Sequence, residues 1–253
     1  MSGPLVLMDG VSKSFGAKLV LDRANLDLME GEILGLVGDN GAGKSTLLKI
    51  LAGVLAPDGG RIYIDGKERK ISSPRRARAL GIEMVYQDLA LCPNMTVWEN
   101  MFLGRYLLKP AGWRFFSILD KTKMARQAQR VIATLGVPVP NPDKPIQSLS
   151  GGQQQAVAMA RCLVSTPQVL LMDEPTASMA IKEKDRILET IVGFRRGGRS
   201  IVMVTHNLPE IFQVADRVLV LKEGRSIWTG SLSGMSPEDL AQLMFTGKRK
   251  SES

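Results

Sequence analysis

The sequence has few of the residues that build small secreted proteins and metal sites. Its 253 residues include two cysteines, one histidine and 5% aromatic residues. Cys92 and Cys162 lie far apart and in no metal-ligand spacing, so neither a disulfide framework nor a zinc site is expected. No apolar run approaches the roughly 18 residues that span a bilayer, and no secretory signal is visible at the start. These absences predict a reduced, cytosolic chain.

The composition is otherwise that of a globular protein with a moderately basic charge. The net charge is +8, but the basic clusters at 75–78, 195–196 and 248–250 are short and scattered. That pattern favours a solvated surface over a nucleic-acid site. The length fits one α/β domain or two smaller ones and is sufficient for a sizeable core.

The most informative stretch is residues 38–46, which follows the G-x-x-x-x-G-K-S phosphate-binding pattern. A buried strand is expected over 32–37 and an apolar-striped helix from 46 onward, whereas a glycine-rich turn without a ligand would need neither. Inward-pointing N–H groups and the helix N-terminus would form an anion site. Lys44 would reach the outer phosphates, and Ser45 would offer its hydroxyl to Mg²⁺. The predicted nucleotide-binding residues here are Gly38, Asp39, Asn40, Gly41, Ala42, Gly43, Lys44, Ser45 and Thr46.

A second group of candidates lies at the ends of predicted core strands. Residues 169–174 form a nearly all-apolar run that ends in Asp173 and Glu174, as expected of a parallel strand covered on both faces. Ligands bind at the carboxyl ends of such strands. Asp173 would hold Mg²⁺ and Glu174 would activate a water. Solvated acids at a strand end are the alternative, and the phosphate-binding loop argues against it.

Three further candidates are ambiguous when taken alone. Gln87 follows a strand at 82–86 and could reach a metal or simply belong to a loop. His206, the single histidine, follows a strand at 200–205 and could be structural or contact a γ-phosphate. Phe15 could stack on a base or plug the core.

Residues 149–153 open another helix with two consecutive glycines, after a proline-rich connector. A helix start of this kind is a second potential anion site, or a flexible start with no ligand. Two phosphate-binding helix starts in one chain are hard to reconcile with one nucleotide within one subunit.

The order of predicted elements gives an interrupted α/β fold. Hairpin-rich strands occupy the N-terminal part, where a first strand is expected over 5–11 and a short one over 26–28. A short basic helix begins at Pro74 and ends at Gly81. Strand signals vanish over 88–148, where helices are expected from Thr96 and over 121–135, with an irregular loop over 109–116. We expect the face over 92–103 to be either a partner surface or merely solvated. The predicted helices and strands that follow are 149–165, 181–196, 200–205, 208–214, 217–222, 225–229 and 237–245.

Five motifs, taken in order, resemble the ATP-binding-cassette (ABC) ATPases over about 5–245. They are the loop at 38–46, Gln87, the 149–153 signature, the 169–174 strand and His206, and the signature is the most specific. The resemblance implies an α/β P-loop NTPase (RecA-like) core with an N-terminal antiparallel β-subdomain and an inserted α-helical subdomain. It implies one cassette over 1–253, with 1–87 and 149–245 as the nucleotide-binding core, 88–148 as the helical subdomain and 246–253 as a frayed tail.

The resemblance also implies a role for each motif residue. Lys44, Glu174 and His206 would be catalytic, with Glu174 as general base. Ser45, Gln87 and Asp173 would serve Mg²⁺, and Phe15 would stack on the base. The signature residues Ser150, Gly151, Gly152 and Gln153 would contact the ATP held by a second cassette, which accounts for the two anion sites. One departure is the stretch 177–180, which lacks the aspartate usual in the wider family.

Four stretches, 38–41, 81–91, 100–105 and 205–207, are similar to bacterial importers of ribose, xylose and fructose, and the single cassette is most like the fructose-import type. This likeness implies an ATPase on the cytoplasmic face of the inner membrane. Its partners would be integral-membrane permease subunits, a second identical or related cassette and, indirectly, a periplasmic sugar-binding protein, with no nucleic acid. Two alternatives are a soluble ABC ATPase acting on nucleic acid or ribosomes and a non-hydrolytic regulator.

Overall fold

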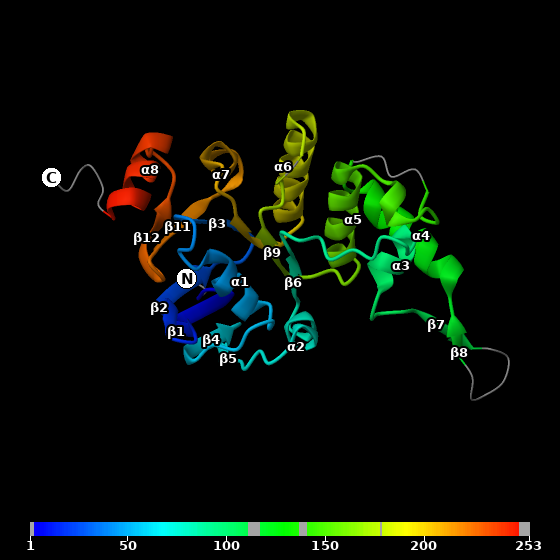
Figure 1. The fold of residues 1–253 in the computed structure, drawn as a ribbon, viewed down its shortest axis with the longest axis horizontal. Helices are drawn as coiled ribbons and strands as arrows, with labels where there is room; N and C mark the ends of the chain where they lie inside the picture. Colours follow the sequence, from blue (N-terminus) through cyan, green and yellow to red (C-terminus); the bar gives the residue numbers. More distant parts are fainter. Residues whose placement is uncertain (1–2, 111–116, 137–140, 178, 248–253) are drawn as a thin grey trace. The chain divides into compact units, whose positions relative to one another are not determined.

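The computed structural model describes residues 3–110, 117–136, 141–177 and 179–247 (Figure 1). Its backbone contacts divide the chain into two units. The core unit comprises 1–87, 167–175 and 191–253, and the helical unit comprises 88–166 and 176–190. Within the described ranges, we find no helix with both the length and the apolar character that a bilayer crossing requires.

The core unit is built on a six-stranded sheet in the order β12-β11-β3-β10-β9-β6. The neighbouring pairs are parallel except that β11 pairs antiparallel with the edge strand β12. Four of the parallel strands, β3, β6, β9 and β10, are buried along their whole length, as expected when both faces are covered. The bounds are β3 (Ile33–Val37), β6 (Ile82–Val85), β9 (Val169–Asp173), β10 (Ser200–Val204), β11 (Arg217–Lys222) and β12 (Arg225–Ser231).

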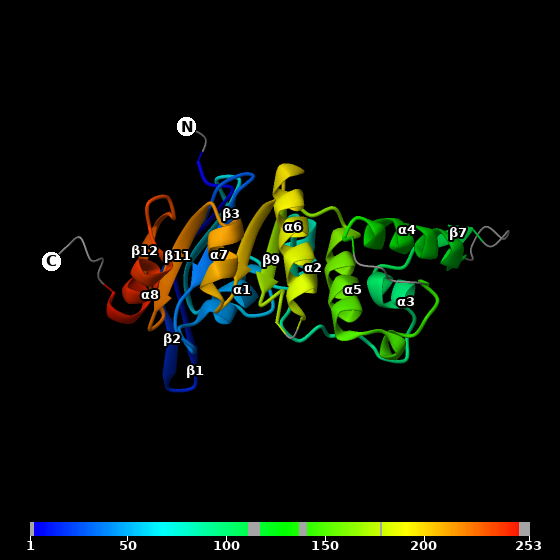
Figure 2. The ribbon, with the colours of Figure 1, turned by 90° about the horizontal axis from the view of Figure 1, so that it is seen from above.

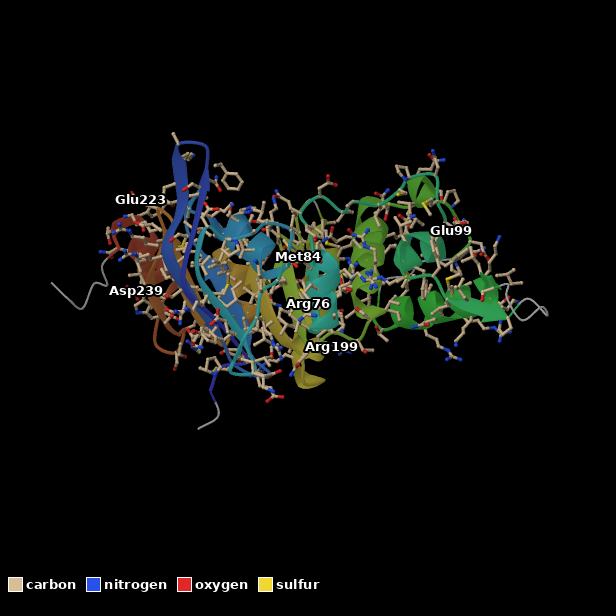
Figure 3. The ribbon with its side chains drawn as sticks, turned by 90° about the horizontal axis from the view of Figure 1, so that it is seen from below. Arg76, Met84, Glu99, Arg199, Glu223 and Asp239 are labelled. Carbon is tan, nitrogen blue, oxygen red and sulfur yellow. The ribbon has the colours of Figure 1, made fainter. Side chains whose placement is uncertain are left out.

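A second, antiparallel sheet in the order β2-β1-β4-β5 belongs to the same unit. Its inward-facing residues alternate along β1, where Val6 and Met8 are fully buried. The bounds are β1 (Val6–Phe15), β2 (Lys18–Leu28), β4 (Gly59–Ile64) and β5 (Lys67–Glu68). The short basic helix α2 (Pro74–Ala79) precedes β6, and its Arg76 is labelled in Figure 3.

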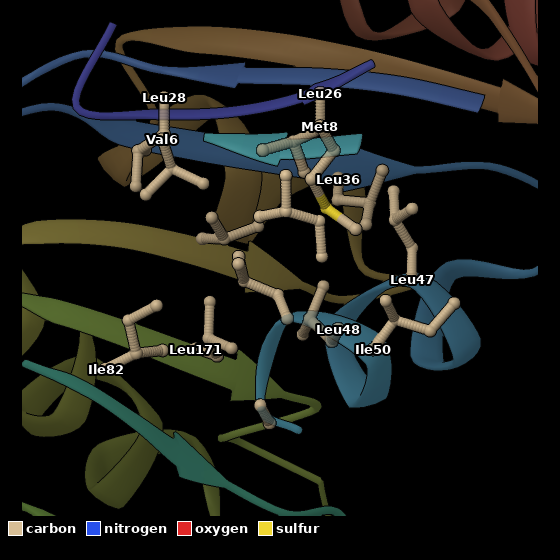
Figure 4. Close-up of a cluster of buried hydrophobic side chains, with 14 of the residues drawn as sticks. Val6, Met8, Leu26, Leu28, Leu36, Leu47, Leu48, Ile50, Ile82 and Leu171 are labelled. Atoms are coloured by element: carbon tan, nitrogen blue, oxygen red, sulfur yellow. The ribbon is translucent and has the colours of Figure 1, made fainter. Parts of the chain in front are cut away.

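The main core fills the space between the two sheets. Helix α1 (Lys44–Leu51) contributes Leu47, Leu48 and Ile50, which pack with side chains of both sheets (Figure 4). The opposite face of the six-stranded sheet is covered by α7 (Leu208–Val214) and α8 (Pro237–Thr246). Alternate residues of β11 therefore enter different cores, since successive side chains of a strand point to opposite faces.

The helical unit consists mainly of three helices that pack on one another (Figure 2). They are α3 (Val97–Phe102), α4 (Lys121–Ala133) and α5 (Gly151–Leu163), with a 3₁₀ turn over Ile146–Ser148. The unit also holds a two-stranded ribbon of β7 (Leu108–Pro110) and β8 (Ser117–Leu119). Helix α6 (Ile181–Arg196) runs from this unit into the core unit.

Asn100 is the polar centre of the helical unit. Its side chain is fully buried, and its Oδ1 accepts a hydrogen bond from the Cys92 N–H at 2.7 Å. Its Nδ2 lies within 3.0–3.2 Å of the carbonyl oxygens of Cys92, Met95 and Thr96. One side chain thus satisfies the backbone of the turn that leads into α3.

The predicted architecture, a mixed α/β fold with an N-terminal antiparallel sheet and a helical block, is confirmed. Three local expectations were wrong. Strands β1 and β2 extend well beyond the predicted 5–11 and 26–28, because they pair as one long hairpin. The segment over 88–148 is not free of strands, since β7 and β8 flank residues 111–116. Those six residues of the predicted loop lie outside the described part of the chain.

The third error concerns the face over 92–103, which we expected to be exposed and which is exposed only in part, at Pro93, Asn94 and Leu103. Trp98 is buried, with 6% of its surface accessible, and its Nε1 donates to Asp143 Oδ1 at 3.1 Å. Glu99 closes a capping box with Thr96, whose backbone and hydroxyl hydrogen bonds lower the pKa of the carboxyl group (Figure 3). Its charge therefore stabilises the start of α3.

The predicted division of the chain placed 149–166 with the nucleotide-binding core. In the structure, α5 packs against α3 and α4 and belongs to the helical unit. A frayed tail was predicted over 246–253. Thr246 is instead the last residue of α8, and residues 248–253 lie outside the described part of the chain.

Replacing Asn100 by alanine should destabilise the protein by about 3 kcal/mol, because buried backbone groups would lose their partner. The midpoint of urea unfolding, followed by circular dichroism, measures this change. The matched control is Asn94→Ala, since Asn94 is exposed, and a change within about 0.5 kcal/mol is expected. Equal effects of the two substitutions would show that the Asn100 hydrogen bonds do not support the unit.

Candidate active site

The register of the parallel strands brings the predicted strand-end residues of the core unit to one edge of the sheet. Val204 of β10 lies beside Leu36 of β3 and Asp173 of β9, and Val85 of β6 lies beside Met172. The residues that follow these strands are therefore neighbours. They are the 38–46 loop, Gln87, Glu174 and His206.

The loop over 38–46 has a backbone path that only glycine can follow at two positions. Gly38 has φ 152°, and a Cβ there would lie 2.0 Å from the Leu221 carbonyl oxygen. Gly43 has φ 101°, and a Cβ there would lie 2.6 Å from Leu21 Cδ2. The turn between β11 and β12 also supports the loop, because Gly224 donates its N–H to the Ala42 carbonyl.

Helix α1 begins at this loop with Gly43 as its N-cap and no side-chain cap. The first N–H groups of a helix have no partner within the helix, and its first turn contains no acidic residue. Asp39, Asn40 and Gly41 are exposed, while Ser45 and Thr46 are half-buried in the first turn. The structure thus offers an uncapped positive helix end at the predicted position, which fits a phosphate group.

Lys44 lies within the loop rather than in solvent. Its Nζ donates to the carbonyl oxygens of Gly38 at 2.7 Å and Asp39 at 2.9 Å. Burial lowers the pKa of the ammonium group, and the negative charges of Glu174 and Asp173 oppose that shift. An anion bound at the loop would further stabilise the protonated form of Lys44, in addition to the two carboxylates.

Ser45 and Asp173 join α1 to β9. The Ser45 Oγ donates to Asp173 Oδ1 at 3.1 Å. Burial raises the pKa of Asp173, and the Ser45 hydrogen bond counteracts this. Two adjacent oxygen donors, one of them a carboxylate, fit Mg²⁺, which combines few protein ligands with phosphate oxygens and water. The described residues contain no cluster of three or more His, Cys, Asp or Glu side chains that would form a cage by themselves.

Glu174 and His206 face each other. His206 Nδ1 lies 2.9 Å from Glu174 Oε2. The Glu174 side chain is 13% exposed and that of His206 is 75% exposed, so the pair lies at the boundary of the solvent. Glu174 has φ 55°, a strained value for this residue type, and its N–H donates to Val204.

A residue that the sequence did not single out holds the His206 loop in place. Glu210 is buried, and its two carboxylate oxygens accept hydrogen bonds from Thr205 Oγ1 at 3.1 Å and Asn207 Nδ2 at 3.0 Å. The Asn207 N–H donates in turn to Thr205 Oγ1. Both neighbours of His206 are thereby fixed, and the spacing of Thr205, Asn207 and Glu210 is the signal that could have revealed this.

The remaining two candidates in the core unit are exposed. Gln87 lies two residues beyond β6, and its side chain makes no hydrogen bond among the residues that the structure describes. Phe15 ends β1 with 48% of its surface accessible, and Lys13 Nζ lies 5.8 Å from the centre of its ring. Phe15 is therefore not a core plug.

The signature residues lie in the other unit, at the N-terminus of α5. Ser150 and Gln153 form a reciprocal capping box, so the Gln153 N–H is satisfied within the chain. Gly151 is exposed, and Gly152 is buried beneath the carboxylate of Glu183. A Cβ on Gly152 would lie 2.5 Å from Glu183 Oε2. The sequence analysis did not identify Glu183 as a neighbour of the signature. Its position in the first turn of α6 is the only feature of the sequence that distinguishes it.

These features define a nucleoside-triphosphate-binding P-loop protein, and comparisons with known proteins specify the family. The model of the ABC transporter family matches residues 21–177. The chain is 44% identical to the fructose import ATP-binding protein FrcA of Rhizobium meliloti, over 97% of this chain and 95% of that protein. The chain belongs to the ABC transporter family.

Other relatives share this similarity. The xylose/arabinose import ATP-binding protein of Sulfolobus acidocaldarius is 38% identical, over 96% of this chain and 94% of the relative. The ribose import ATP-binding protein of Caldanaerobacter subterraneus is 40% identical over 95% of this chain, which spans only 47% of that relative.

Solved structures agree on the fold. A nucleotide-free ATP-binding cassette from an ABC transporter matches with a TM-score of 0.81 at 24% identity, over 97% of this chain and all of that chain. A dimeric bacterial ABC transporter cassette matches with a TM-score of 0.76 at 26% identity, over 91% and 100%. The predicted P-loop NTPase fold is confirmed.

The two loop glycines allow a paired test of the backbone argument. Gly38→Ala should destabilise the protein by about 3 kcal/mol or more, because the new methyl group meets the rigid Leu221 carbonyl at a disfavoured φ. Gly41→Ala should cost about 1 kcal/mol, since its Cβ would meet nothing and only φ 81° is strained. Urea unfolding measures both, and a larger loss for Gly41→Ala would refute the assignment of the close contact.

Asp173→Asn should raise the melting temperature of the nucleotide-free protein in a chelator at neutral pH, while it lowers Mg-ATP turnover. The folded-state pKa of Asp173 is raised, so its charged form is disfavoured at pH 7. The gain should shrink as pH falls through that pKa, because the wild-type carboxyl becomes neutral there.

Asp58→Asn is the control for this substitution. The Lys13 hydrogen bond lowers the pKa of Asp58, so its replacement should not raise the melting temperature. A higher melting temperature for both variants, or a gain for Asp173→Asn that does not depend on pH, would argue against burial as the cause.

Proposed function

We propose that this chain is the ATP-hydrolysing subunit of an ABC importer and powers the uptake of a monosaccharide. One observation carries the chemistry. The phosphate-binding loop, the Ser45–Asp173 pair and the Glu174–His206 pair all lie at the same edge of one parallel sheet. A hydrolytic site needs an anion cradle, a place for the metal and a base, and all three are present.

The cradle binds the phosphates of ATP. Lys44 Nζ, which now faces two loop carbonyls, pairs with the β- and γ-phosphate oxygens. The loop residues from Gly38 to Thr46 present their N–H groups, and the exposed ring of Phe15 stacks on the base. Because the loop is already folded around Lys44, little ordering is required when ATP binds.

Ser45, Asp173 and Gln87 hold Mg²⁺, which supplies neutralisation of phosphate charge when it is bound. Glu174 accepts the proton of the attacking water. His206 donates its Nδ1 hydrogen to Glu174 Oε2 in the present arrangement, and when the imidazole turns toward the nucleotide, a ring N–H donates to an oxygen of the γ-phosphate. Glu210 keeps the His206 backbone fixed while the exposed imidazole remains free to turn.

The signature completes the site of a second cassette. Ser150, Gly151, Gly152 and Gln153 contact the ATP held by the partner copy, so that two ATP molecules lie between two chains. Dimeric ABC cassettes among the solved structures support this arrangement. ATP binding then closes the pair and hydrolysis releases it, which converts binding energy into motion.

The transport role rests on relatives that are named as fructose, ribose and xylose/arabinose import ATP-binding proteins. We propose that the chain works at the cytoplasmic face of the membrane, docked on integral-membrane permease subunits that a periplasmic sugar-binding protein supplies. No observation favours action on nucleic acid or ribosomes. The 177–180 stretch lacks the family's usual aspartate, and the carbonyl of Ala180 at its end accepts a hydrogen bond from the N–H of Glu183 of α6.

Glu174→Gln should lower steady Mg-ATP turnover at least about 100-fold, because the base that accepts the water proton is lost. ATP affinity should stay near that of the wild type, and ATP should now trap a stable dimer. Phosphate release and size-exclusion chromatography measure these two effects. Lys44→Ala should instead abolish ATP binding itself.

Glu68→Gln is the matched control, since Glu68 is an exposed glutamate of β5 in the same unit, and its turnover should equal that of the wild type. Turnover that survives in Glu174→Gln would reject Glu174 as the base. Loss of transport in reconstituted vesicles should accompany loss of turnover. Sugar uptake that continues in the inactive variant would reject the importer role.

A further inference from the structure

The largest concentration of exposed apolar side chains lies in the helical unit. Of the eleven large apolar side chains that are exposed within the described residues, five fall between positions 103 and 119. They are Leu103, Tyr106, Leu108, Ile118 and Leu119, and Leu108 is 62% exposed. Scattered apolar residues need no explanation, but a gathered set does.

Three of these side chains lie on the β7–β8 ribbon. Leu108 pairs with Leu119, and Lys109 pairs with Ile118. Cross-strand partners share a face, so the two leucines lie on one face and Ile118 on the other. All six residues of the two strands are exposed. The ribbon therefore shows apolar side chains on both faces, although an isolated two-stranded ribbon is marginally stable in water.

The ribbon is joined rigidly to the start of α4. The Leu107 N–H donates to Met124 Sδ at 3.3 Å, and the Leu107 carbonyl accepts from the Asp120 N–H at 2.8 Å. The Asp120 carboxylate caps α4 through the Lys123 N–H. The orientation of the ribbon relative to α4 is thus fixed by hydrogen bonds within the helical unit.

Helix α4 carries a basic stripe. Met124, Ala128 and Ile132 are buried along one face, whereas Lys123, Arg126 and Arg130 are exposed. At 100° per residue, these three basic positions cluster opposite the buried face. The helix contains no acidic residue, and none of the three basic side chains forms an ion pair within the described residues.

The segment that contains the ribbon and most of α4 is also basic. Among the described residues between 103 and 130, six are Lys or Arg and one is acidic, which gives +5. The whole chain carries +8. The apolar ribbon thus lies next to a basic segment, which is one of two in the chain, since residues 61–78 also carry a net charge of +5.

We propose that the ribbon–α4 patch, defined as Leu108, Ile118 and Leu119 together with Lys123, Arg126 and Arg130, binds the surface of an anionic lipid bilayer. Exposed apolar side chains enter the interface, and the basic stripe is attracted to anionic headgroups. A protein groove would cover one face of the ribbon, whereas the lipid interface surrounds both. A nucleic-acid backbone would match the basic stripe but leave the aliphatic side chains in water. The inference is independent of the ATPase chemistry and depends on the proposed function only for the proximity of a membrane.

The test is sedimentation of the purified full chain with phosphatidylcholine vesicles, with and without phosphatidylglycerol, in the absence of permease and nucleotide. Wild-type protein should sediment with the anionic vesicles, and added salt should weaken the binding. Arg126→Gln with Arg130→Gln should weaken binding about 30-fold, because two basic residues are lost at an anionic surface. Leu108→Ser with Leu119→Ser should weaken it about tenfold or more.

Arg75→Gln with Arg78→Gln is the matched control. It removes the same charge from exposed positions of another short basic helix, α2, and binding should change less than twofold. ATP turnover of all three double variants should equal that of the wild type, so a failure of vesicle binding is distinguishable from a failure of the proposed ATPase.

Three results would overturn the proposal. The first is that the wild-type chain does not sediment with anionic vesicles. The second is that the α2 double variant and the α4 arginine double variant weaken sedimentation equally. The third is that the α4 arginine double variant loses RNA binding but still binds vesicles. Equal loss would indicate that net charge rather than the patch is responsible. A loss confined to RNA would identify the stripe as a nucleic-acid contact.

Discussion

The hydrogen-bond register of the parallel strands β3, β9 and β10 is the constraint on which the rest of the molecule depends. It sets Leu36, Asp173 and Val204 side by side, so whatever follows each strand emerges at the same edge. The loop after β3 can then be a phosphate cradle only because Gly38 and Gly43 pass closer to Leu221 and Leu21 than any side chain would allow. The chemistry is assembled by strand ends, and the two cores keep those ends in place.

The residues at this edge of the sheet reduce the stability of the protein without a ligand. Burial disfavours the charged forms of both Lys44 and Asp173, and Glu174 has a strained backbone. At the proposed site, a triphosphate and its metal would supply charges opposite to those of Lys44 and Asp173, so the binding energy of the substrate would relieve a pre-existing electrostatic imbalance. In this proposal, the residues that lower the stability of the free protein are the ones that hold its substrate.

The sequence was sufficient where chemistry and backbone demand a local pattern. The glycine and lysine spacing of the loop, the two acids after an apolar run and the helix start at Thr96 are such patterns, and the structure contains the elements they require. It was insufficient where a contact joins distant segments. Glu183 meets Gly152 across thirty positions, the burial of Trp98 depends on Asp143, and β7 and β8 pair around intervening residues. No window of sequence contains both members of such a pair.

The support of the loop by the β11–β12 turn has a consequence for how the protein is made. The carbonyl of Ala42 accepts a hydrogen bond from the N–H of Gly224, and the carbonyl of Gly224 accepts one from the backbone N–H of Asp22. A ribosome that adds 5–20 residues per second needs roughly 10–40 s to proceed from the codon of Ala42 to that of Gly224. During that interval the nascent chain already contains every residue of the nucleotide loop but not the segment that fixes its shape. Competence to bind ATP therefore arrives late in synthesis, and a chain released early contains the motif without the site.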